Sequence, residues 1–218
     1  MWLKQTILAT QKIKVLLFDL GGVIIDLFPE RTIASFAQLA NKTERAVADA
    51  YEGAGIFQQH EKGLIGNEEF RAEIQQHFAF SADSSAFDTA WNAMLGDIPS
   101  DIVASVETLK TRYKCCVLSN TNAIHEKAFH QILAKQHGLR HLNELFDKVY
   151  FSHELKERKP DEAIYLKVIS DLGLKAEEVL FLDDSEINIA AAKAVGIQGL
   201  YIPRNGGFQN LLKAYLKA

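Results

Sequence analysis

The first strong pattern in the chain is typical of a buried parallel strand. The apolar run Ile13–Phe18 is rich in β-branched and aromatic residues, ends at Asp19 and is followed at once by Gly21 and Gly22. An apolar run bounded by glycines predicts a strand that is covered on both faces. Asp19 would then lie at the carboxyl edge of the sheet, where open α/β sheets bind ligands. The alternative is that Asp19 only stabilises the turn that follows.

The next segment, residues 28–96, has the periodicity of helices and no convincing strand. Four signals of helices occur in it: a start at Pro29, a start near Asn41, a start at Asn67 with Phe70, Ile74 and Phe78 on one face, and the apolar pair Trp91 and Leu95. Apolar residues three and four positions apart are typical of helices that bury one face. We therefore expect a cluster of helices between the first strand and the rest of the chain.

From Pro99 onward, helix and strand patterns alternate. Helices are predicted at 101–113, 125–137, 161–172, 187–195 and the end of the chain, with strands at 114–118, 148–152, 178–182 and 197–202. Such alternation predicts right-handed βαβ crossovers and a parallel sheet. The fold class is therefore α/β, a Rossmann-like core formed by residues 1–27 and 97–218 with a helical cap domain inserted at residues 28–96.

Composition narrows the classes of partner and the compartment. The 218 residues carry 24 basic and 28 acidic side chains, a net charge of −4, which indicates neither a nucleic-acid nor an anionic-membrane partner. No apolar stretch is long enough to span a bilayer, and residues 1–6 lack the pattern of a secretory signal. Cys115 and Cys116 are adjacent in a predicted strand, so they face opposite sides, and we expect two free, buried cysteines rather than a disulfide. A cytoplasmic protein is expected; the sequence does not indicate its oligomeric state.

Four polar groups lie at positions that a parallel sheet would bring together. They are Asp19, the pair Ser119–Asn120, Lys159 and the pair Asp183–Asp184. Each has a structural alternative: Ser119 and Asn120 as cap and turn residues, Lys159 as a solvated side chain, and the aspartate pair as a partner of the next helix dipole.

Together these residues suit phosphoryl chemistry better than they suit four unrelated structural roles. Carboxylates are the ligands that Mg²⁺ prefers. A hydroxyl and the amides at a helix N-terminus bind phosphate oxygens. A lysine neutralises charge on a phosphoryl group in transfer.

Four short motifs resemble those of the haloacid dehalogenase (HAD) superfamily, in order and at reasonable spacing. They are Phe18-Asp19-Leu20-Gly21-Gly22-Val23, Leu118-Ser119-Asn120-Thr121-Asn122, Arg158-Lys159-Pro160-Asp161 and Phe181-Leu182-Asp183-Asp184-Ser185. The cap segment Phe57-Gln58-Gln59-His60-Glu61-Lys62-Gly63 is similar to that of the α-D-glucose-1-phosphate phosphatase subgroup. The resemblance covers nearly the whole chain after Lys12.

The resemblance implies a role for each motif residue. Asp19 would be the nucleophile that forms an aspartyl-phosphate, with Lys159 paired to it and to the phosphoryl group. Ser119 and the amides that follow it, beginning with Asn120, would hold phosphoryl oxygens. Mg²⁺ would be bound by Asp19, the Gly21 carbonyl and Asp184, with help from Asp183.

Gly21 departs from the pattern of most phosphatases of this superfamily. They carry a second aspartate two residues after the nucleophile, which protonates the leaving alkoxide; glycine cannot do so. The glucose-1-phosphate phosphatase subgroup also has glycine there, so the residue does not by itself indicate an inactive enzyme.

The expected function is hydrolysis of a small phosphorylated metabolite, such as a sugar 1-phosphate, with Mg²⁺. A metal-free dehalogenase-type hydrolase and an inactive binding protein of the same fold are the alternatives. The Asp183–Asp184 pair favours the phosphatase, because a metal-free site for a carboxylate substrate gains nothing from more negative charge. Specificity is expected in the cap, where His60, Glu61 and Trp91 are candidate contacts, although for each residue alone a surface or packing role is the stronger interpretation.

Overall fold

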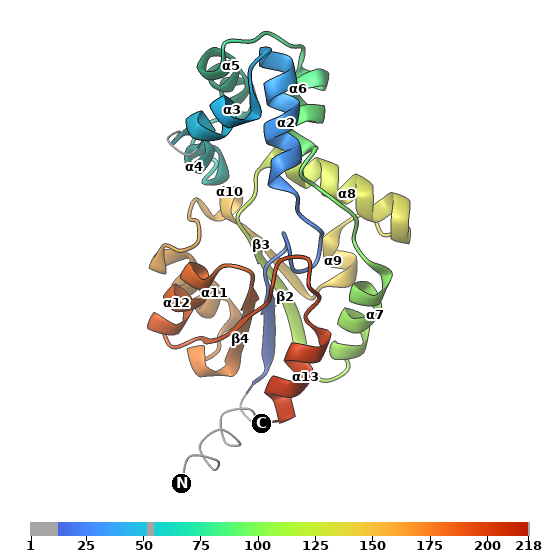
Figure 1. The fold of residues 1–218 in the computed structure, drawn as a ribbon. Coiled ribbons are helices and arrows are strands. Elements are labelled where there is room, and N and C mark those ends of the chain that lie inside the picture. Colours follow the sequence, from blue (N-terminus) through green and yellow to red (C-terminus); the bar gives the residue numbers. More distant parts are fainter. Residues whose placement is uncertain (1–12, 52–54, 218) are drawn as a thin grey trace.

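A five-stranded parallel sheet forms the centre of the protein (Figure 1). The structure, a computed structural model, describes residues 13–51 and 55–217. The strand order is β3-β2-β1-β4-β5. The strands are β1 (Val15–Phe18), β2 (Lys114–Ser119), β3 (Lys148–Phe151), β4 (Val179–Asp183) and β5 (Gln198–Tyr201). The predicted α/β fold with a parallel sheet is confirmed.

Both faces of the sheet are buried, which explains why its strands read as continuous apolar runs. Alternate residues enter different hydrophobic clusters: Leu16 and Cys115 belong to one, Leu17 and Cys116 to the other. The two cysteines are therefore on opposite faces, and both are free, as the sequence predicted.

Helices cover the two faces in separate layers. On one face lie α7 (Ser100–Leu109), α8 (Ala123–His137), α9 (Leu142–Leu145) and α13 (Gln209–Lys217), and on the other lie α11 (Glu162–Leu172) and α12 (Glu186–Ala194). The short helices α10 (Ser152–Leu155) and η1 (Ala176–Glu178) lie in the connections before α11 and β4.

A second group of helices stands beyond the carboxyl ends of the strands (Figure 1). It comprises α2 (Pro29–Ala40), α3 (Glu44–Tyr51), α4 (Ile56–Glu61), α5 (Asn67–Phe78) and α6 (Ser84–Asn92). These helices share their own hydrophobic cluster, to which the core helix α8 adds Ile124. We call residues 28–96 the cap, using the domain boundaries that were predicted from the sequence.

Two connections join the cap to the core, and they lie side by side. Leu27 and Leu95 form an antiparallel bridge. On either side of it, Phe28 N–H donates to the Met94 carbonyl at 2.8 Å and Gly96 N–H donates to the Asp26 carbonyl at 2.8 Å. The paired connections form a short two-stranded hinge at the sheet edge that carries the polar motifs.

Several predicted boundaries differ from the observed ones. Leu95 lies beyond α6, because its backbone takes part in the hinge bridge. The helix expected at 101–113 ends at Leu109, and α4 was not predicted, since six residues are too few to show a helical period. Among the described residues, no helix combines the length and apolar character that a membrane crossing needs. Residues 1–6, for which no secretory signal was expected, lie outside the described residues.

His125 of α8 joins the core to the cap. Its ring is 8% exposed and stacks on Trp91 of α6, with 4.6 Å between ring centroids. Its Nδ1–H donates to Asn92 Oδ1 at 2.7 Å. Burial, with a smaller contribution from the nearby His60, lowers the pKa of His125 to about 3, so the ring is neutral at pH 7.

This contact predicts a pH-dependent stability. The folded state excludes a proton that the unfolded chain binds below pH 6.5, so stability is full above pH 6.5 and falls as the pH decreases toward 3. Between pH 7.5 and 5.0 the loss from His125 should be about 2 kcal/mol. Urea unfolding at both values should show a smaller difference for His125→Gln than for the wild type. An equal pH dependence in the two proteins would contradict the assignment.

Candidate active site

The polar motifs come together at the carboxyl edge of the sheet. Asp19 directly follows β1, and its backbone N–H donates to the Leu182 carbonyl of β4 at 2.8 Å. Ser119 ends β2 and Asp183 ends β4, the two strands that flank β1. Because neighbouring parallel strands end at the same edge, residues more than 160 positions apart in sequence lie in one site.

Lys159 is buried between two of these carboxylates. Its side chain is 1% exposed, and its Nζ lies 2.7 Å from Asp19 Oδ1 and 2.8 Å from Asp183 Oδ2. Burial alone would lower the pKa of Lys159, but the two carboxylates outweigh burial and raise it above its usual range. The lysine is therefore a fixed positive charge.

The ionisation of Asp19 reflects its crowded surroundings. Burial raises the pKa of Asp19 to about 7, with the charge of Lys159 opposing the rise and those of Asp183 and Asp184 adding to it. Both hydrogen bonds to the Asp19 carboxylate that the described residues provide, from Lys159 Nζ and from the Leu20 N–H at 2.7 Å, are to Oδ1. The second oxygen, Oδ2, is left for another partner.

Asn120 fixes the loop that carries Lys159. Its Nδ2 donates to the Lys159 carbonyl, and its Oδ1 accepts from the Lys159 N–H, both at 2.8 Å. The Asn120 side chain is thus engaged with the protein, whereas the sequence analysis placed it on the substrate. The second Nδ2 hydrogen and the backbone of Asn120 are not used by these two bonds, so its predicted contact with a phosphoryl group stays a prediction.

Ser119 lies beside the N-terminus of α8. Its side chain is buried, and its only hydrogen bond within the described residues is a long one of 3.4 Å to the Asn120 carbonyl. Asn122 is the N-cap residue, accepting from the backbone of Ile124 and His125. The N-terminus of a 15-residue helix and a weakly bonded hydroxyl therefore share this edge, an arrangement suited to an anion.

The two acidic residues at the end of β4, Asp183 and Asp184, have different partners. Asp183 is fully buried and accepts hydrogen bonds from Lys159 Nζ, from the Ser185 N–H at 2.7 Å and from Asn188 Nδ2 at 3.1 Å. Asp184 pairs with Arg204, whose Nε lies 2.6 Å from Oδ2. One carboxylate oxygen from each of Asp19, Asp183 and Asp184 lies within 4.8 Å of the others, so this donor set fits a cation that prefers oxygen ligands.

Close packing explains the two glycines that follow Asp19 and Leu20. Gly22 has φ +78°, and a Cβ there would lie 2.7 Å from Asp184 Oδ2 and 2.9 Å from Arg204 Cγ. A Cβ on Gly21 would meet Leu27 Cδ2 at 3.1 Å. Leu27 therefore lies beside the position at which other members of the resembled superfamily carry the acidic side chain.

Two residues of this region were not identified from the sequence. Arg204 pairs with Asp184, and Asn205 binds the hinge: its Oδ1 accepts from the Leu27 N–H at 2.9 Å and its Nδ2 donates to the Leu27 carbonyl at 3.2 Å. Both lie in the loop after β5, which has no motif-like spacing. No signal in a single sequence could have linked them to Asp184 and Leu27.

The candidate cap contacts separate into two kinds. His60 and Trp91 are 3% and 4% exposed and pack inside the cap, where His60 stacks on Phe70. Glu61 instead reaches the core, with its Oε2 2.9 Å from Arg158 Nε.

Comparisons with known proteins agree with this geometry. The sequence profile of a hydrolase family described as haloacid dehalogenase-like hydrolase matches residues 13–196. A D-ribitol-5-phosphate phosphatase from Bacteroides thetaiotaomicron is 29% identical over 194 residues, which are 89% of this chain and 93% of that protein.

Two similar solved structures extend the comparison. The HAD family enzyme BT-2542 of Bacteroides thetaiotaomicron, in complex with magnesium and inorganic phosphate, matches with a TM-score of 0.82 and 35% identity over 91% of this chain and 98% of that chain. A predicted HAD-like family hydrolase from Porphyromonas gingivalis has a TM-score of 0.85 and 28% identity over 95% and 99% of the respective chains.

Gly22 offers a direct test of how tightly the site is packed. Gly22→Ala should lower the free energy of unfolding by about 2 kcal/mol or more, because the left-handed backbone and the clash with the Asp184 carboxylate both oppose a Cβ. Gly21→Ala is the matched control: its nearest contact is the end of the Leu27 side chain, so its cost should stay below about 1 kcal/mol. Equal costs in urea unfolding would contradict this account.

Proposed function

Because this chain belongs to the haloacid dehalogenase-like hydrolase family, we propose that it is a Mg²⁺-dependent phosphatase whose substrate is a phosphorylated sugar or polyol. The observation that carries the proposal is the cluster in which Lys159 bridges Asp19 and Asp183, with Asp184 alongside. It combines a nucleophile, a fixed positive charge and an oxygen donor set in one site. The magnesium and phosphate complex of BT-2542 supports the same chemistry here.

Asp19 is the proposed nucleophile. Lys159 and the Leu20 N–H hold Oδ1, which leaves Oδ2 as the oxygen that attacks the phosphorus. Attack forms an aspartyl-phosphate and releases the alcohol, and water then hydrolyses the aspartyl-phosphate. Lys159 neutralises charge on the transferring group in both steps.

Mg²⁺ would be held by Asp19, the Gly21 carbonyl and Asp184, while Asp183 would support the metal site mainly by fixing Lys159. The side chains of Asp19, Asp183, Asp184, Lys159 and Arg204 sum to a charge of −1 when all are ionised, so a phosphate dianion would be repelled. When bound, the cation would offset that repulsion and stabilise charge on the phosphoryl oxygens. It would also favour the ionised form of Asp19, which burial otherwise disfavours.

Two observations bear on the leaving group. The relative from Bacteroides thetaiotaomicron is a ribitol-5-phosphate phosphatase, and that substrate is a primary alkyl phosphate. Gly21, by contrast, supplies no acid for the departing oxygen, which favours a leaving group that carries negative charge well. A sugar 1-phosphate has such a leaving group, because the ring oxygen acidifies the anomeric hydroxyl.

The first test is hydrolysis of p-nitrophenyl phosphate. Activity should require Mg²⁺ and disappear in excess EDTA, and Asp19→Asn should reduce kcat by about 10³-fold or more while leaving the fold intact. Asp184→Asn should raise the Mg²⁺ concentration needed for half-maximal activity. Asp49→Asn, a substitution of an exposed carboxylate, is the control and should behave as the wild type. Full activity in EDTA would favour the metal-free dehalogenase-type reaction.

The second test concerns the missing acid. Across a series of aryl phosphates, kcat/KM of the wild type should fall steeply as the phenol becomes less acidic, since the transition state is loose and the oxygen departs largely unprotonated. Gly21→Asp should flatten this dependence, best combined with Leu27→Ala to make room for the carboxylate.

Sugar 1-phosphates should accordingly react faster than sugar 6-phosphates, with ribitol 5-phosphate measured alongside. A shallow aryl series, together with equal rates for anomeric and primary phosphates, would show that another group donates the proton.

A further inference from the structure

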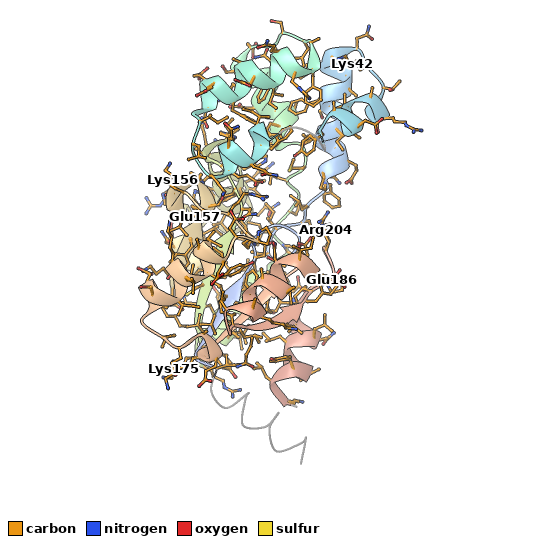
Figure 2. The ribbon with its side chains drawn as sticks, turned by 90° about the vertical axis from the view of Figure 1, so that its left-hand side faces the viewer. Lys42, Lys156, Glu157, Lys175, Glu186 and Arg204 are labelled. Atoms are coloured by element: carbon orange, nitrogen blue, oxygen red, sulfur yellow. The ribbon has the colours of Figure 1, made fainter. Side chains whose placement is uncertain are left out.

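A further contact between cap and core is made by three consecutive residues, Glu61, Lys62 and Gly63, at the end of α4 and just after it. All three contact the core segment 153–161, which carries Lys159. The contacts are Glu61 Oε2 with Arg158 Nε at 2.9 Å, Lys62 Nζ with Asp161 Oδ2 at 2.7 Å, and Lys156 Nζ donating to the Gly63 carbonyl at 2.8 Å. Figure 1 shows α4 beside α10, at the start of this segment, and Figure 2 labels Lys156 at the same junction.

Backbone packing makes this approach close. Gly63 has φ +59°, and a Cβ there would lie only 2.4 Å from the His153 carbonyl oxygen and 2.7 Å from Lys156 Nζ. No other residue fits at this position without moving the cap away from the core. The turn after α4 is therefore shaped to dock against segment 153–161.

Of the two ion pairs at the junction, Glu61–Arg158 is the more enclosed. Its side chains are 27% and 22% exposed, against 27% and 45% for Lys62–Asp161. Burial raises the pKa of Glu61, the guanidinium of Arg158 opposes the rise, and the charge of Lys159 also reaches this carboxylate. The pair thus lies in a partly desolvated junction within electrostatic range of the catalytic lysine.

Arg158 and Lys159 are neighbours in sequence, but different parts of the protein hold them. Asn120 holds the backbone of Lys159 from the core, whereas Glu61 holds Arg158 from the cap. The second anchor exists only when the cap is docked. Rotation about the hinge at Leu27 and Leu95 would separate Glu61 from Arg158 and leave both charges unpaired.

We propose that Glu61 and Arg158 form a closure latch, a pair of positioning residues that fixes Lys159 against Asp19 when the cap docks. The proposal rests on the proposed function, because it assigns the latch to the phosphoryl-transfer site. Closure would then exclude water and complete the alignment of Lys159 in one movement. Opening for product release would loosen the segment that carries Lys159.

The decisive variant is Glu61→Gln, which removes the charge with little change in shape. We expect kcat for p-nitrophenyl phosphate to fall by about tenfold or more with a smaller change in KM, since alignment is lost and the phosphate site remains. Lys62→Met is the matched control: it removes the neighbouring cap–core ion pair without touching Arg158, so kcat should stay within about twofold of the wild type. The charge-swapped double variant Glu61→Arg/Arg158→Glu should recover part of the lost kcat.

Hydrogen exchange provides a readout that does not depend on turnover. With Mg²⁺ and inorganic phosphate present, segment 153–161 should exchange faster in Glu61→Gln than in the wild type and in Lys62→Met. Equal exchange and equal kcat in Glu61→Gln and Lys62→Met would overturn the latch. If the wild type hydrolyses no phosphate ester but Glu61→Gln still loosens the segment, the proposed function fails and the closure contact stands. If Glu61→Gln does not fold, Arg158→Lys takes its place, because it keeps the charge but loses the guanidinium geometry. The expected results are the same: a lower kcat and faster hydrogen exchange of segment 153–161.

Discussion

The site depends on one buried cation. Lys159 is almost completely removed from solvent, and such a charge is stable only if paired and hydrogen-bonded. Asp19 and Asp183 supply the pairing, and their places at the ends of adjacent strands fix where the ammonium lies. Asp19, Lys159 and Asp183 therefore cannot be varied independently, because removing one leaves another buried charge without one of its partners.

The surroundings of this triad restrict both backbone and cap. Gly22 has to be a glycine so that Asp184 and Arg204 can approach the turn after Asp19. Asn205, next to Arg204 in the loop after β5, binds the backbone of the hinge residue Leu27. On the other side, Gly63 allows the cap to approach the segment that carries Lys159. The site is thus supported from the hinge and from the docking turn, which are the two places at which cap movement would be felt.

Much of this arrangement could be predicted from the sequence. Strands buried on both faces give apolar runs, and parallel strands bring their carboxyl ends together, so Asp19 and Asp183 were expected at one edge. The partners of Asp184 and Glu61 could not be predicted. Asp184 pairs with Arg204, 20 positions away, and Glu61 pairs with Arg158, 97 positions away. Neither separation leaves a periodic pattern in the sequence. The engagement of Asn120 with the Lys159 backbone was likewise invisible, since the motif shows only that an amide is present.

The central claim is that Asp19 carries the phosphoryl group during turnover, with Lys159 beside it. Mass spectrometry of protein quenched in acid during turnover of p-nitrophenyl phosphate tests this claim most directly. The account predicts an increase of one phosphoryl group on the peptide that contains Asp19, labile to hydroxylamine as an acyl phosphate should be. A phosphoryl group on another residue, such as a histidine of the cap, or turnover without any trapped phosphoprotein under single-turnover conditions, would contradict it.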